Sequence, residues 1–320
     1  GGGGLGGNPN KTDESAKGLK AGVDITITNG VVQINSLDDA IHSDNNITIN
    51  GGDLFLASSD DGLHADSTLT VNGGTLAITH SYEGLESATI TINGGNIHIV
   101  ASDDGINAVS DDSTAAGGGM MPGPRNFEAA NNYLYINGGY LAIDAMGDGL
   151  DVNGTIDMTG GLVIVNGPTN NGNGPLDYLG AFNITGGFLV AVGSAGMAQA
   201  PSMSSTQYSM MYIFDSPQAA GTMVHIEAED GEEILTFVPT KEYQSVVVSS
   251  PELKNGLTYY VYTGGSSSGT TSDGLYSGGT YTAGTQVTSF TVSSVVTVAG
   301  AYGGGFPGSN MPGPGGRRRP

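Results

Sequence analysis

The stretch from Ser59 to Gly74 reads Ser-Asp-Asp-Gly-Leu-His-Ala-Asp-Ser-Thr-Leu-Thr-Val-Asn-Gly-Gly. It begins with an acidic pair and a glycine, continues with a run in which apolar and polar side chains alternate, and ends in Asn-Gly-Gly. The acidic-Gly-apolar element returns at a near-constant step along the first half of the chain. Its central residues, spaced by 22, 22, 21 and 44 positions, are Ala40, Gly62, Gly84, Gly105 and Gly149. A repeat of this length is typical of a solenoid.

Each repeat contains three short extended stretches. In one repeat, residues 90–92 and 96–99 alternate apolar and polar side chains around a Gly-Gly turn, and a third stretch covers residues 105–108. Three strands in about 22 residues fit one coil of a parallel β-helix, in which each coil stacks on the last. Parallel crossovers favour the right hand, so we expect an all-β, right-handed parallel β-helix. The side chains expected to point inward in two coils are Ile47, Ile49, Leu54, Leu56, Leu69, Val71, Leu76 and Ile78.

The repeat also predicts the organisation of the chain. We expect a Gly-rich N-terminal segment (1–12), a single β-helix domain (13–302) and a Gly/Pro/Arg tail (303–320). The domain has regular coils over residues 13–192, with an inserted loop at 110–132 that is rich in Gly, Pro and Met. From 193 to 302 the 22-residue step is lost while short strands persist. We interpret this part as irregular coils, with a separate small β-domain as the alternative.

The composition excludes several classes of protein. The 320 residues include 9 Lys and Arg against 31 Asp and Glu, a formal charge of −22, which makes nucleic acid and anionic lipid poor partners. The chain has no Cys, so it has no disulfide or thiolate site. Its apolar runs are too short to cross a bilayer, so we expect no membrane insertion. The first residue is Gly rather than Met, which indicates a processed, secreted or cell-surface protein.

Stacked coils place equivalent residues about 4.8 Å apart, so the acidic pairs form columns. One column holds Asp39, Asp61, Glu83, Asp104 and Asp148, and the column beside it holds Asp38, Asp60 and Asp103. Two carboxylates at that distance repel by about 3–4 kcal/mol at an effective dielectric near 20. Calcium takes oxygen ligands at about 2.3–2.6 Å, so one ion between two coils can touch both carboxylates. The columns therefore predict bound Ca²⁺, with turn formation and solubility as the alternative role of these acids.

Two further columns follow from the same spacing. One lies two residues after the glycine and holds Lys20, His42, His64, Glu86, Asn107, Asp151 and Asp177. We expect His42 and His64 to be either ligands or a stacked pair that faces solvent. The other column is an asparagine ladder of Asn29, Asn50, Asn72, Asn93 and Asn137, which we expect to be structural.

With these motifs, the chain resembles a known family: the secreted β-helix carbohydrate-binding domain-containing proteins of clostridia and related bacteria. Residues 59–65, 90–95, 149–154, 173–178 and 273–281 carry the likeness. The resemblance implies a pectate-lyase-like, calcium-binding β-helix that binds acidic or cellulosic polysaccharide without catalysis. It places the metal ligands at Asp38, Asp39, Asp60, Asp61, Glu83, Asp103, Asp104, Asp148 and Asp151. Tyr82 and Gly147 interrupt the acidic pair, so their coils depart from the pattern.

Three functions fit these observations. The first is an extracellular, non-catalytic binder in which calcium bridges the protein to uronate carboxylates, with His42, His64, Glu86, Tyr82 and Asp177 near the polysaccharide. Tyr133, Tyr135 and Tyr140 are further candidates for stacking on sugars. The second is a calcium-dependent polysaccharide lyase, which needs a Lys or Arg base, and Lys17 and Lys20 lie at column positions. The third is a surface fibre, because open solenoid ends favour homo-oligomers that stack end to end.

Overall fold

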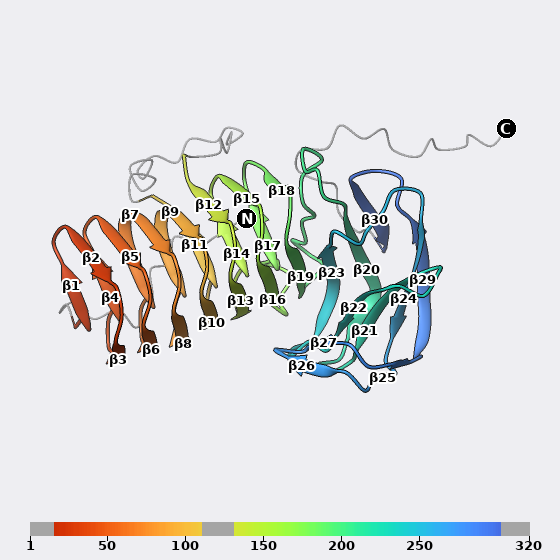
Figure 1. The fold of residues 1–320 in the computed structure, drawn as a ribbon, viewed down its shortest axis with the longest axis horizontal. Coiled ribbons are helices and arrows are strands. Elements are labelled where there is room, and N and C mark those ends of the chain that lie inside the picture. The colour runs from red at the N-terminus through yellow and green to blue at the C-terminus, as the bar shows by residue number, and fades with distance from the viewer. Residues whose placement is uncertain (1–15, 111–130, 302–320) are drawn as a thin grey trace.

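The computed structural model describes residues 16–110 and 131–301. Within these residues the chain forms strands and no helix, and the strands β1 to β19 wind into seven stacked coils (Figure 1). The predicted all-β solenoid is thus confirmed, while its hand stays a prediction. The expected N-terminal segment (1–12), the tail (303–320) and nearly all of the inserted loop (110–132) lie outside the described residues.

Each coil contributes three strands, as the sequence predicts. The first strands are β1 (Leu19–Ala21), β4 (Ile41–Ser43), β7 (Leu63–Val71), β9 (Leu85–Ile92), β11 (Ile106–Ala108), β14 (Leu150–Val152) and β17 (Leu176–Tyr178). The second strands are β2 (Asp24–Ile27), β5 (Asn46–Ile49), the later parts of β7 and β9, β12 (Tyr133–Ile136), β15 (Thr155–Met158) and β18 (Phe182–Ile184). The third strands are β3 (Val31–Ser36), β6 (Asp53–Ser58), β8 (Thr75–Ser81), β10 (Asn96–Ala101), β13 (Tyr140–Ala145), β16 (Leu162–Asn166) and β19 (Phe188–Gly193).

Two parallel sheets run the length of the solenoid. Sheet A contains the first and second strands, and sheet B contains the third strands. The register keeps the sequence repeat, so that Leu19, Ile41, Leu63 and Leu85 are successive partners across four coils. Each coil therefore repeats the side chains of the last one at nearly the same place.

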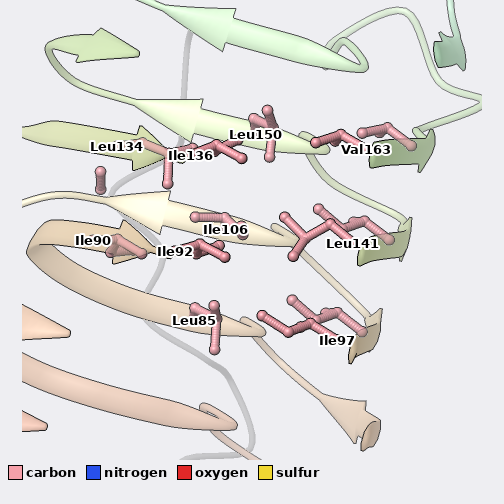
Figure 2. Packing of buried hydrophobic residues seen from close by; sticks show 14 of the residues in the cluster. Leu85, Ile90, Ile92, Ile97, Ile106, Leu134, Ile136, Leu141, Leu150 and Val163 are labelled. Carbon is pink, nitrogen blue, oxygen red and sulfur yellow. The ribbon is translucent and has the colours of Figure 1, made fainter. Parts of the chain in front are cut away.

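The core consists of rows of branched apolar side chains between the two sheets. Leu85, Ile106 and Leu150 form one row from sheet A, and Ile97 and Leu141 belong to a row from sheet B (Figure 2). All eight side chains predicted to point inward from residues 47–78 are at most 1% exposed. Each fully buried Leu or Ile contributes about 1.5–3 kcal/mol, so the rows supply a continuous driving force along the axis.

The asparagine ladder is structural, as expected. The Asn72 side chain donates to Asn50 at 2.8 Å and Asn93 donates to Asn72 at 2.7 Å. Asn137 donates to Asn93 at 2.9 Å, across the inserted loop. These bonds link four successive coils, from Asn50 to Asn137, and keep the register across the insertion.

The strands after Gly193 differ from the irregular coils that the sequence analysis expects. They are β20 (Ser209–Gln218), β21 (Val224–Ala228), β22 (Glu233–Phe237), β23 (Tyr243–Ser249), β24 (Thr258–Thr263), β25 (Ser266–Ser267), β26 (Thr270–Ser272), β27 (Leu275–Ser277), β28 (Tyr281–Thr282), β29 (Thr285–Thr291) and β30 (Val296–Gly300). They pair mostly antiparallel: β23 lies between β19 and β20 and is antiparallel to both, and sheet B ends at β30. Alternating residues predict a strand but not its direction. The boundaries of the domains stay a prediction.

A six-stranded antiparallel sheet packs on the outer face of sheet B. Its order is β26-β27-β22-β21-β24-β29. Phe237 and Tyr259 from this sheet share a second hydrophobic core with Ile164 and Val190 from the solenoid. This face of the last coils is therefore covered, and the acidic columns lie away from it, at the corner that joins sheet B to sheet A.

The Gly-Gly turns supply a test of the coil stacking. Gly74 has φ +91°, and a Cβ there would lie 2.5 Å from the carbonyl oxygen of Gly52 in the coil below. At Gly73 the nearest atom to a Cβ is the carbonyl oxygen of Asn50 at 3.4 Å, an ordinary contact. We expect Gly74→Ala to lower the free energy of unfolding by more than about 1 kcal/mol, and the control Gly73→Ala to change it far less, measured by urea unfolding. Equal losses in the two variants would contradict this account of the turn.

Candidate functional site

The acidic pairs lie at the corner where each third strand turns into the first strand of the next coil. The register places Lys20, His42, His64, Glu86, Asn107, Asp151 and Asp177 in one uninterrupted row, as predicted. Most acids of these pairs are buried, Asp39 completely, while Glu83 and Asp103 are partly exposed. Their role is therefore not to solubilise an edge.

Carboxylates tie the corners of successive coils together. Oδ1 of Asp39 accepts the amide of Asp61 at 3.3 Å, and Oδ1 of Asp61 accepts the amide of Glu83 at 3.3 Å. Further along, Oδ1 of Asp104 accepts the amide of Asp148 at 2.6 Å. A short acidic side chain at this position thus satisfies a buried main-chain donor of the next coil, which explains why the acid repeats with the coil.

The glycine or alanine that follows the acid allows this close approach. A Cβ at Gly84 would collide with the carbonyl oxygen of Gly105 and with Ile99. The coil that has Ala40 at this position instead keeps that residue fully buried. The repeated glycine is therefore a packing requirement of the corner, and it brings the acids of neighbouring coils together.

At the N-terminal end of the columns, cationic side chains of the protein itself neutralise the acids. Lys17 pairs with Asp39 and, at 3.1 Å, with Asp38. Nδ1 of His42 lies 2.8 Å from Oδ2 of Asp39. Burial alone would raise the pKa of Asp39, but the hydrogen bonds from His42 and Lys17 outweigh it and hold that pKa well below its usual value.

His42 and His64 are not the solvent-facing pair that we considered from the sequence. Their ring centroids are 4.8 Å apart in an edge-to-face arrangement, and their side chains are only 10% and 15% exposed. Burial disfavours the charged form of His64, but Asp61 and its neighbours outweigh this effect and raise the pKa of the ring. Both rings therefore lie inside the acidic row rather than on the surface.

Within residues 16–110 and 131–301, no such cationic side chain lies at the C-terminal half of the columns. We define this half as Glu83, Asp103, Asp104, Asp148 and Asp151, and no lysine or histidine of the described residues pairs with any of them. Oxygens of Asp104, Asp148 and Asp151 lie within 4.8 Å of one another. Burial, reinforced by neighbouring acids, raises the pKa of Asp104 to about 10 and those of Asp148 and Asp151 to about 7. Burial also raises the pKa of Glu83.

In two coils the first acid of the pair is replaced, by Tyr82 in one and by Gly147 in the other, and the two replacements act differently. Gly147 has no side chain, and a Cβ there would collide with Oδ1 of both Asp103 and Asp104, so the glycine leaves room for these two carboxylates. Tyr82 makes a hydrogen bond with Asp103, and this bond and burial raise the pKa of its phenol. Asp177, at the end of the row, accepts a hydrogen bond from Gln199 at 2.8 Å.

One buried oxygen next to these acids was not singled out from the sequence. The side-chain nitrogen of Asn107 donates to Glu83 at 2.8 Å, while its Oδ1 is buried without a hydrogen-bond partner. Asn107 lies between Glu86 and Asp151 in the register of the row. Calcium binds amide as well as carboxylate oxygens. The C-terminal half therefore suits this ion in three respects: its ligand atoms are oxygens, its charge is negative, and the Oδ1 atom of Asn107 has no other partner.

Sheet A carries a second feature beside the row. Tyr133 and Tyr135 on β12 have parallel rings, with centroids 5.8 Å apart and an interplanar angle of 11°. Tyr140 differs, because its hydroxyl donates to Asp273 of the C-terminal region at 2.5 Å. Of these three tyrosines, Tyr133 and Tyr135 thus form a pair of parallel rings on the sheet that bears the acids.

Residues 3–62 and 57–105 match a family model described as carbohydrate-binding domain-containing protein. The match covers the N-terminal half of the columns and also Glu83, Asp103 and Asp104 of the C-terminal half. No curated protein and no solved structure matches the chain. The similarity supports carbohydrate binding as the general activity of the matched coils.

Lys17 provides a test of the internal neutralisation. Its side chain is buried against Asp38 and Asp39, so Lys17→Met leaves two buried carboxylates without their cation. We expect the free energy of unfolding to fall by about 3–5 kcal/mol in urea titrations. The control is Lys20→Met, because Lys20 is half exposed and lies 3.4 Å from Asp44, a pair worth at most about 1 kcal/mol. Similar small losses in both variants would refute the assignment.

The raised pKa values predict how the chelator-treated protein responds to pH. The pKa values of Asp148 and Asp151 are higher in the folded state than the ordinary value of 3.8. Such a carboxyl stabilises the fold at low pH, and this contribution is lost as the pH rises through the pKa of the folded state. Between pH 5 and pH 8 we expect the melting temperature to fall, at a cost of at most about 1.4 kcal/mol per pH unit for each carboxyl. Asp148→Asn should make the profile flatter. A melting temperature that rises over this range would contradict the prediction.

Proposed function

We propose that the protein is an extracellular, calcium-dependent binder of acidic polysaccharide, such as polygalacturonate, and that it is not an enzyme. The observation that carries the proposal is the division of the acidic columns. Lys17 and the histidines pair with acids of the N-terminal half, whereas no lysine or histidine of the described residues pairs with the clustered carboxylates of the C-terminal half. A dication in that half turns an acidic surface into one that accepts the carboxylates of a uronate chain.

The ligands that we propose for this calcium ion are Asp104, Asp148, Asp151, Glu83 and the Oδ1 atom of Asn107. Calcium tolerates six to eight oxygens in irregular geometry, and remaining positions would be filled by water or by sugar oxygens. Asp38, Asp39, Asp60 and Asp61 belong to the half that contains Lys17 and the histidines. We therefore assign the calcium to the opposite end of the ladder.

The tyrosine pair supplies the second part of the binding surface. Tyr133 and Tyr135 lie on the second strand of their coil, a few residues along sheet A from the position of Asp151. Aromatic faces pack well against the apolar face of a sugar ring, and two parallel rings can stack on successive residues of one chain. The proposal thus combines an ionic contact at the row with stacking beside it.

The lysines support the non-catalytic part of the proposal. A lyase requires a basic residue that is free to remove a proton beside a uronate carboxyl. In residues 16–110 and 131–301 every lysine is engaged in an ion pair, and none lies at the C-terminal half of the columns: Lys17, Lys20, Lys241 and Lys254. Lys11 and Arg125 lie outside the described residues. The alternative of an end-to-end filament stays a prediction; β23 occupies the edge of the last solenoid strand, β19, and sheet B continues beyond it to β30.

The test is calorimetric titration of chelator-treated, calcium-reloaded protein with polygalacturonate, with the absorbance of unsaturated products followed in the same mixture. We expect calcium-dependent heat and no rise in absorbance. The double variant Asp104→Asn/Asp148→Asn should lose calcium binding and polysaccharide binding together, by at least tenfold each. The control Asp53→Asn, which changes an exposed acid at the start of β6, should retain both.

The tyrosine pair is tested in the same assay. Tyr133→Ala/Tyr135→Ala should keep calcium binding and weaken polysaccharide binding by roughly tenfold, as expected for the loss of one or two stacking contacts of about 1 kcal/mol each. Calcium-independent binding, or binding that survives in the double Asp variant, would rule out the proposed bridge. Rising absorbance would instead identify a lyase.

A further inference from the structure

His64 and His42 occupy the same position in successive coils but have different surroundings. Both nitrogens of His42 are engaged, since Nδ1 lies 2.8 Å from Asp39 and Nε2 lies 3.0 Å from Asp44. In contrast, Nδ1 of His64 is buried and makes no hydrogen bond. Its surroundings offer only longer contacts with carboxylates, an arrangement that a bound cation would complete.

Two carboxylates face this nitrogen from different coils. Oδ2 of Asp61, at the corner of the same coil, lies 3.3 Å from Nδ1 of His64. Oε2 of Glu86, the partner of His64 in the next coil, lies 3.4 Å from the same atom. Both separations are longer than good hydrogen bonds. Two ligand atoms bound to the same tetrahedral ion, each at about 2.0–2.1 Å from it, lie about 3.4 Å apart, and the two separations at His64 match this distance.

The far side of the imidazole also fits metal binding through Nδ1. Nε2 of His64 faces Oδ1 of Asp66 at 3.6 Å. In metal centres the second ring nitrogen usually donates its proton to a carboxylate, which fixes the tautomer and the direction of the ring. Asp66 is the group in position to accept that proton.

The donor set selects a class of ion. One imidazole nitrogen with two carboxylates suits Zn²⁺, Co²⁺ and related first-row ions, whereas Ca²⁺ prefers an all-oxygen shell. A fourth protein ligand is not available from Asp39, because its Oδ2, 3.9 Å from Nδ1 of His64, already accepts from Lys17 and His42. The side chains of His64 and Glu86 are 15% and 17% exposed, so one side of the group is open to water or to an oxygen of a bound molecule.

We propose that His64, Asp61 and Glu86 form a second metal site, which binds a first-row transition ion such as Zn²⁺ through one nitrogen and two carboxylate oxygens. The site has three protein ligands and an open fourth position, as in zinc centres that bind an exogenous ligand. It shares no ligand with the proposed calcium ion and does not rest on the proposed function. The two sites therefore give separate results in one experiment.

The test uses Co²⁺ as a coloured substitute for Zn²⁺. Chelator-treated protein is saturated with Ca²⁺ and titrated with Co²⁺, and the visible absorption of the bound ion is followed. We expect one Co²⁺ per chain with the intense spectrum of a four-coordinate centre, and displacement of Co²⁺ by Zn²⁺. His64→Gln and, independently, Glu86→Gln should each weaken Co²⁺ binding at least tenfold while leaving the calcium titration unchanged.

His98→Gln is the matched control, because His98 lies on sheet B and its Nε2 faces Asp273 at 3.0 Å. This variant should bind Co²⁺ as the parent does. Unchanged Co²⁺ binding in His64→Gln and Glu86→Gln would overturn the proposal. So would Co²⁺ that competes with Ca²⁺ and disappears in Asp104→Asn/Asp148→Asn, because that result would place it in the calcium site. Melting curves of each variant establish that the coils remain folded.

Discussion

The constraint on which the rest of the structure depends is the register of the parallel coils. Main-chain hydrogen bonds hold each coil on the last, so a residue type that repeats in the sequence repeats in space at about the distance between strands. For apolar residues this repetition produces rows that fill the interior, and for asparagine it produces a ladder of side-chain hydrogen bonds. For acidic residues the same repetition is costly, because like charges must lie side by side.

The protein meets that cost differently at the two ends of the columns. In the first coil, Lys17 occupies the position where later coils have an acid. In the second and third coils, histidines occupy the position of the row where later coils have an amide or a carboxylate. Beyond Glu86 the row contains only amide and carboxylate side chains, and burial raises the pKa of Asp151 in the row and of Asp104 beside it, which disfavours their charged forms unless a cation is added. A regular fold with a single repeat thus contains two chemically different sites, because only a few positions in the repeat change.

Much of this arrangement could be predicted from the sequence because it depends only on periodicity. The rows of inward side chains, the asparagine ladder and the row from Lys20 to Asp177 are all consequences of equal spacing, and the structure confirms them. The burial of the acidic pairs could not be predicted, because it depends on how closely the corners of the coils approach one another. Spacing also gave no means of separating His42 from His64, since they differ only in the partners that their ring nitrogens reach.

The C-terminal region shows the other limit of periodicity. Its strands were recognised from alternating residues, but parallel and antiparallel strands have the same alternation, so the antiparallel cap was not distinguished from irregular coils. This cap ends the solenoid in two ways. β23 pairs antiparallel with the last solenoid strand, β19, and the antiparallel sheet buries the outer apolar residues of the last coils, including Ile164 and Val190. Asp273 extends the contact by reaching His98 and Tyr140. Because the antiparallel sheet covers the outer face of sheet B at the last coils, a ligand there meets the corner that carries the acids and sheet A, which carries the tyrosine pair.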